Sequence, residues 1–90
     1  MPHITTFSGL IRRALMVEGM FPAWIFVNKY TNTRSVKCYN ATPAMVAAVG
    51  QVAASRNVNV QYHERSAGRR GKSCIFTFDR KFHYLNEMTK

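Results

Sequence analysis

The hydrophobic pattern of the chain changes its period from segment to segment, and this change constrains the fold more than any other feature. In residues 6–20, apolar side chains recur at the three- and four-residue spacing of an amphipathic helix. Residues 34–39 instead alternate between apolar and polar side chains, as half-buried strands do. The expected elements, in order, are helix 6–20, strand 23–27, strand 34–39, helix 43–56, strand 58–65 and strand 74–79.

Cap and turn residues agree with these boundaries. Thr5 or Thr6 can accept a hydrogen bond from an unpaired amide at the start of the first helix, and Gly19 can end that helix. Thr42 followed by Pro43 is a strong helix start, because proline at the first helical position loses no hydrogen bond. The loops therefore separate two helices and two hairpins.

The order α-β-β-α-β-β predicts an α+β fold, with a four-stranded antiparallel sheet and two helices on one face. We expect a single domain over residues 1–90, with a frayed tail at 83–90. The same order of elements occurs in 6–40 and again in 42–82, which hints at an internal αββ duplication. Residues 23–27 do not alternate, so we expect this strand to be buried on both faces for part of its length.

The chain is strongly basic. Thirteen Lys and Arg residues stand against four Asp and Glu residues, which gives a formal net charge of +9. The four acids can neutralise at most four cations, and a field of this size on a small domain attracts polyanions. Nucleic acid, either DNA or RNA, is the expected partner; an acidic protein surface and a basic protein with no specific anion partner are the alternatives.

The two cysteines, Cys38 and Cys74, fall within strand-like segments and are too few for a disulfide framework, which favours reduced thiols. The N-terminus lacks the pattern of a signal peptide, and the longest apolar run, 23–27, is far too short to cross a bilayer. We therefore expect a cytoplasmic protein that does not bind membranes. No cofactor or metal site is expected, since the His and Cys residues lack the short paired spacing of zinc ligands.

Residues 66–73 form a loop rich in Gly and Arg, and this loop is the first candidate binding site. It ends in Gly-Lys-Ser like a phosphate-binding P-loop, but Ser66 stands where that motif needs Gly, and a strand follows where it needs a helix. Cations crowd this hairpin tip, and its two glycines would let backbone amides approach an anion. The alternative is a solvated hairpin end. The cations of the tip are Arg65, Arg69, Arg70 and Lys72.

The sheet face away from the helices is the second candidate. Alternation places Lys37, Tyr39 and His63 on this face, together with Gln61, Arg65 and Thr77. Tyr39 and His63 are suited to stacking on bases and Lys37 to contacting phosphates, as in proteins that bind single strands. An ordinary solvated face or a homodimer interface is the alternative. Arg12 and Arg13 are expected to extend the basic surface from the first helix.

The sequence offers little for catalysis, and we expect a protein that is not an enzyme. Glu64 and Asp79 would become cross-strand neighbours in one register of the second hairpin, but surface ion pairs explain them more simply than a nuclease site.

The alternative to nucleic-acid binding is a small inhibitor or adaptor, of viral or cellular origin, that docks on an acidic surface of a larger protein or nucleoprotein complex. Such a surface needs large apolar anchors near its centre. Four residues could supply them: Met20, Phe21, Trp24 and Met88.

Overall fold

A computed structural model describes residues 6–20 and 24–82, and within this part it confirms the predicted fold class and element order. Two short 3₁₀ helices, η1 and η2, follow β3 and β4. The elements are α1 (Phe7–Val17), β1 (Trp24–Asn28), β2 (Thr33–Tyr39), α2 (Pro43–Ser55), β3 (Gln61–Ser66), η1 (Gly68–Arg70), β4 (Lys72–Asp79) and η2 (Arg80–Phe82). None of the described helices is long and apolar enough to span a membrane.

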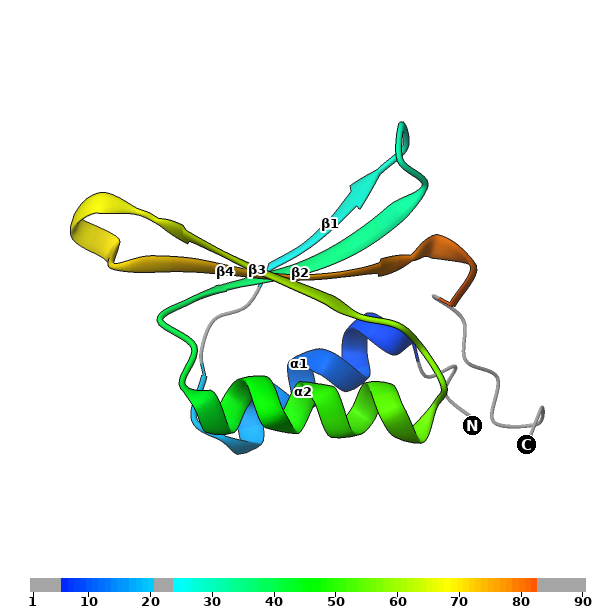
Figure 1. Cartoon of the computed structure of the whole chain (residues 1–90), viewed down its shortest axis with the longest axis horizontal. Helices are drawn as coiled ribbons and strands as arrows, with labels where there is room; N and C mark the ends of the chain where they lie inside the picture. The colour runs from blue at the N-terminus through cyan, green and yellow to red at the C-terminus, as the bar shows by residue number, and fades with distance from the viewer. Residues whose placement is uncertain (1–5, 21–23, 83–90) are drawn as a thin grey trace, which may run out of the picture.

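The four strands form one antiparallel sheet in the order β1-β2-β4-β3. Figure 1 shows both helices on one face of this sheet, running in opposite directions, and the β3–β4 hairpin extending past the helices on the left. The opposite face is covered by no described element, so it is the open face, as predicted from the sequence.

The core lies between the sheet and the helices. Val36 and Phe76 face each other on the two central strands, and Phe7 of α1 packs edge-on against Phe78 with ring centroids 4.8 Å apart. Cys38 and Cys74 are also opposite each other in this layer; both are free and fully buried, and burial raises the pKa of the Cys38 thiol to about 11. Burial of both thiols agrees with a packing role, because a free cysteine in a core behaves as a small apolar side chain.

The two helices begin and end in the same way. Thr6 Oγ1 accepts a hydrogen bond from the Gly9 amide at 3.1 Å, and Thr42 Oγ1 accepts one from the Met45 amide at 3.2 Å. Each helix then closes with a bond between residues five apart in sequence, in the pattern of a Schellman turn. These bonds run from Met20 N to Leu15 O (2.9 Å) and from Val58 N to Ala53 O (3.0 Å).

The two central strands, β2 and β4, also match each other in their hydrogen bonds. Asn40 N donates to Lys72 O at 2.8 Å, and Arg80 N donates to Asn32 O at 3.0 Å, so the same bond occurs at both ends of the β2–β4 ladder. With the palindromic strand order, the two αββ halves are related by an approximate two-fold axis near the Val36–Phe76 pair. The repeat suggested by element order is thus present in the backbone geometry.

One expectation about the first strand is wrong. Ile25 and Phe26 were expected to be buried, but they are 39% and 49% exposed, and every other residue of β1 is exposed as well. The apolar run does not lie between layers, because among the described strands β1 is an edge strand that pairs with β2 alone.

Candidate nucleic-acid interface

The strand register brings aromatic and basic side chains into rows across the open face. Trp24 lies opposite Lys37, which lies opposite Ile75, which in turn lies opposite His63. Residues opposite each other in an antiparallel pair point to the same face, so this row crosses all four strands. Lys37 and His63 were predicted on this face, and the register confirms both.

Tyr39 is the centre of a cluster on the same face. The Trp24 ring meets it edge-on, with ring centroids 5.6 Å apart and planes at 81°. Lys37 Nζ lies 5.2 Å from the Tyr39 ring centroid, and the Arg70 guanidinium carbon lies 5.4 Å from it. Arg70 Nη1 also donates to the Tyr39 hydroxyl oxygen at 3.1 Å. This arrangement places two cations beside two aromatic rings.

These cations change the acidity of the phenol. The hydrogen bond from Arg70, followed by the interaction with Lys37, lowers the pKa of Tyr39 from its usual 10.0. The shift means that positive charge is concentrated at Tyr39, because an adjacent cation favours the ionised form of a phenol. An incoming phosphate would meet the same field.

The cations of the hairpin tip do not all lie on one surface. Arg65 is opposite Ser73, which is opposite Tyr39, so Arg65 belongs to the open face. Arg69 is exposed within η1, and Arg70 reaches back to Tyr39. Together with Trp24, Phe26, Lys37, Tyr39 and His63, the residues Arg65 and Arg70 form what we call the sheet platform.

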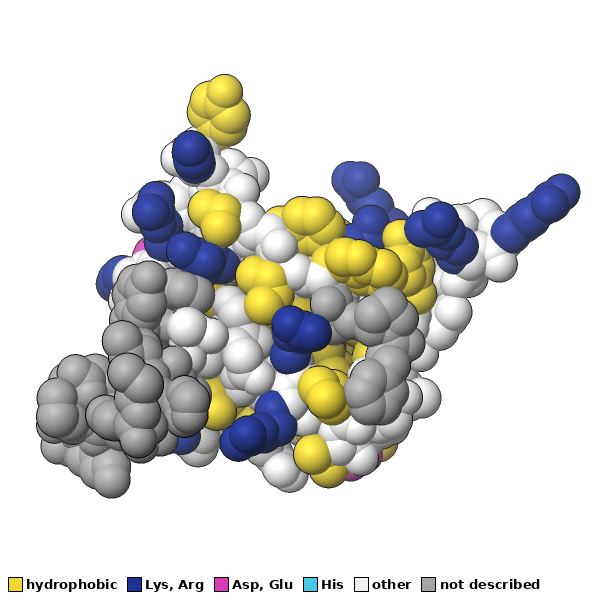
Figure 2. Space-filling view, turned by 180° about the vertical axis from the view of Figure 1, so that it is seen from behind, with side chains coloured by type: hydrophobic (Ala, Val, Ile, Leu, Met, Phe, Trp, Pro, Cys, Tyr) yellow, Lys and Arg dark blue, Asp and Glu magenta, His cyan; other side chains and the backbone are white. Residues whose placement is uncertain are grey.

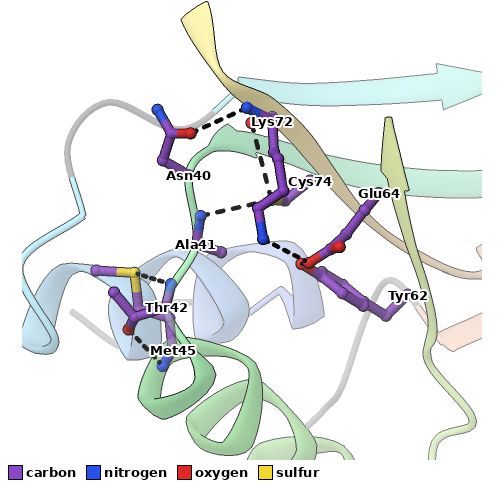
Figure 3. A network of polar contacts seen from close by, with 8 residues as sticks. All are labelled: Asn40, Ala41, Thr42, Met45, Tyr62, Glu64, Lys72 and Cys74. Carbon is purple, nitrogen blue, oxygen red and sulfur yellow. Dashed lines mark hydrogen bonds and ion pairs between the residues drawn. The ribbon is translucent and has the colours of Figure 1, made fainter. Parts of the chain in front are cut away.

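Lys72 is held on the other side of the hairpin. Its Nζ lies 3.2 Å from Glu64 Oε2, and the Tyr62 hydroxyl donates to the same oxygen at 2.6 Å (Figure 3). Glu64 is opposite the buried Cys74, which places the pair on the helix-facing side. The predicted grouping of Lys72 with the tip arginines is therefore wrong. Lys72 lies two residues before Cys74 on β4, so its side chain points to the same helix-facing side, where it has a carboxylate partner.

Three backbone amides of the tip already have hydrogen-bond partners. Gly71 N donates to Gly68 O at 3.1 Å and Ala67 N donates to Gly71 O at 2.7 Å, while Lys72 N donates to the Asn40 side-chain oxygen at 2.9 Å (Figure 3). The amides of Ala67 and Gly71 are therefore bonded within the turn and that of Lys72 is bonded to Asn40, so these three amides are not available to an anion.

Two further expectations do not fit the arrangement. Arg12 and Arg13 are exposed on α1, in the layer on the opposite side of the sheet from the platform, so they cannot extend that surface. Glu64 and Asp79 are not neighbours, because Glu64 is opposite Cys74 and Asp79 is opposite Thr33.

Trp24 and Phe26 were not predicted as parts of this surface. Both are exposed, at 41% and 49%, and their register partners Lys37 and Ser35 put them on the open face. The sequence does contain a signal for their position. Counting outward from the 29–32 turn pairs residue 24 with residue 37, which places Trp24 on the same face as Lys37.

Figure 2 shows hydrophobic side chains between two groups of projecting Lys and Arg side chains. An open groove of about 660 Å³ lies along β1, β2 and β4, with Phe26, Lys37 and Ile75 in its lining. Within the described residues, Lys72–Glu64 is the one ion pair, so the platform cations have no carboxylate partner there.

The anchors predicted for protein docking are mostly not available. Met20 is buried against the core, Trp24 is exposed, and Phe21 and Met88 lie outside the described residues. In the part of the chain that the structure describes, no three His, Cys, Asp or Glu side chains are grouped to hold a metal ion. No protein family, curated protein or solved structure matches this chain.

Proposed function

We propose that this protein binds nucleic acid, DNA or RNA, through the sheet platform and the arginines of the β3–β4 tip, without catalysing a reaction. The observation that carries the proposal is the cluster at Tyr39, where the Trp24 and Tyr39 rings adjoin the Lys37 and Arg70 charges on the sheet face that no described element covers. Aromatic rings can stack on bases, while the neighbouring cations contact phosphates.

Electrostatics would supply most of the affinity. Each phosphate contact releases counterions, which gives a log–log salt slope of about −0.7 on single strands and about −0.9 on duplex DNA. The net charge of +9 would also speed association with a polyanion. The free, buried thiols Cys38 and Cys74 agree with a cytoplasmic location, which is part of this proposal.

A matched pair of triple variants tests the proposal. One replaces Arg65, Arg69 and Arg70 with Ala; the other replaces Arg12, Arg13 and Arg56, which are exposed on the helix layer. Both remove three positive charges, so they differ only in where the charge is lost.

Mobility shifts of generic DNA and RNA, titrated with salt, give the readout. The tip variant should bind more weakly and lose about 2–3 from its salt slope, whereas the helix-layer variant should bind nearly as the wild type does. Equal losses in the two variants would show that overall charge, and not the platform, causes binding. Failure of the wild type to bind at low salt would refute the function itself.

Docking on an acidic protein surface has weaker support. Of its predicted anchors, the described residues leave only Trp24 exposed, and a docking hot spot usually contains several large apolar side chains at its centre.

A further inference from the structure

The two edges of the sheet occupy equivalent places in the two αββ halves but differ in chemistry. The β3 edge carries charged side chains, Glu64 and Arg65, which discourage pairing with another strand. The β1 edge carries no charged residue, and its four apolar side chains, Trp24 to Val27, are 39–49% exposed. An exposed edge strand of this composition can readily pair with a further strand.

The hydrogen-bond pattern shows which backbone groups of β1 have no partner in the four-stranded sheet of the described residues. The bond from Asn40 N to Lys72 O shows that even-numbered residues of β2 point their backbone groups toward β4. Odd-numbered residues of β2 therefore point toward β1, where their partners are Trp24, Phe26 and Asn28. By the same alternation, the amides and carbonyls of Ile25 and Val27 point outward from the sheet.

We propose that β1 pairs antiparallel with β1 of a second copy, in a register centred on Phe26. This register sets Ile25 opposite Val27 of the other copy as the hydrogen-bonded pairs, which uses the outward backbone groups. On the open face it sets the two Phe26 side chains opposite each other. The result is a continuous eight-stranded sheet.

The composition of β1 favours a second copy as the occupant. Two molecules of net charge +9 repel, but β1 carries no charged residue, so no register of two β1 strands sets like charges directly opposite each other. The strand is also self-complementary, because Ile25 faces Val27 of the other copy on the helix side and Phe26 faces Phe26 on the open face. Nucleic acid would leave Ile25 and Val27, on the helix-facing side, uncovered.

Sedimentation velocity over a concentration series tests the pairing and does not depend on nucleic-acid binding. The wild type should form dimers, and Val27→Lys should raise the dimer dissociation constant about tenfold or more, because symmetry brings two new charges to the interface. His63→Lys is the matched control, since it adds the same charge to the exposed β3 edge and should leave the dimer intact.

Cross-linking tests the register. Phe26→Cys should give a disulfide-linked dimer under mild oxidation, because opposed residues of a non-hydrogen-bonded pair lie within disulfide range. Tyr30→Cys, at the fully exposed hairpin turn, should cross-link far less, and the native cysteines are buried. A wild type that stays monomeric at all concentrations would overturn the proposal. The proposal would also fail if such a monomer bound a different protein through β1. Equal cross-linking of the two variants would overturn the register.

Discussion

The side-chain amide of Asn40 occupies the space where a Cβ atom on Gly71 would lie. Asn40 Nδ2 donates to Arg70 O at 2.8 Å, and Asn40 Oδ1 accepts from Lys72 N at 2.9 Å, so one side chain binds both sides of Gly71. This contact fixes the base of the β3–β4 tip to the end of β2. It thereby sets where Arg70 leaves the turn and meets Tyr39.

Replacing Gly71 with Ala should destabilise the protein by about 1–3 kcal/mol. Gly71 has a φ of 89°, which is strained for any residue with a Cβ, and the new methyl group would displace the Asn40 amide. Urea denaturation followed by circular dichroism measures the loss. A variant as stable as the wild type would show that Asn40 does not hold this position.

Gly50→Ala should have the opposite effect. Gly50 is an exposed helical residue of α2, and a Cβ atom there would meet nothing within 4 Å. Alanine is favoured over glycine in a helix by about 1 kcal/mol, so the free energy of unfolding should rise by about 0.5–1 kcal/mol. The same denaturation experiment measures the gain, and a loss of stability would indicate a close contact at this helix face.

Asn40→Ala should loosen the tip more than it destabilises the whole domain. Two side-chain hydrogen bonds are lost at an exposed site, which predicts a cost of about 1–2 kcal/mol. Hydrogen exchange should show a faster Lys72 amide, while the Val36 amide of the central strand should change little. Unchanged protection at Lys72 would contradict the role assigned to Asn40.

The Glu64 carboxylate should titrate below its usual pKa of 4.5. The hydrogen bond from the Tyr62 hydroxyl, followed by that from Lys72, lowers the pKa of Glu64. Because the folded-state pKa is depressed, any stabilisation is present above pH 4.5 and is lost as the pH falls through the folded-state value. Carboxyl chemical shifts followed against pH should show Lys72→Met raising the pKa of Glu64 toward 4.5; an unchanged value would exclude Lys72 as a partner.

Hydrophobic periodicity and helix caps were sufficient to predict the fold. Both helices have threonine caps, and apolar and polar side chains largely alternate along β2, β3 and β4. The same alternation predicted Lys37, Tyr39 and His63 on the open face. The four apolar residues from Trp24 to Val27 do not alternate, so composition alone suggested burial, whereas the edge position of β1 exposes them. Whether a strand lies at the edge or in the centre of the sheet depends on how the two hairpins pair. That pairing is set by contacts between residues far apart in the sequence.

The β3–β4 tip shows a second limit of prediction from the sequence. The alternation of β4 predicts Lys72 on the same side as Cys74, whereas the density of positive charge in 65–72 predicts one group of four cations. The structure follows the alternation and pairs Lys72 with Glu64. Met20, at the end of the expected helix 6–20, was a candidate apolar anchor for protein docking. The turn bond from its amide to Leu15 O instead brings Met20 back against the core.

The most direct test of the binding surface is the fluorescence of Trp24, the protein's only tryptophan, during titration with a single-stranded oligonucleotide. The indole is 41% exposed and lies on the platform beside Tyr39, so stacking of a base should quench its emission. We predict saturable quenching whose midpoint moves to higher oligonucleotide concentration as salt is raised. Binding that is detected by anisotropy of a labelled oligonucleotide but leaves the Trp24 emission unchanged would contradict the platform.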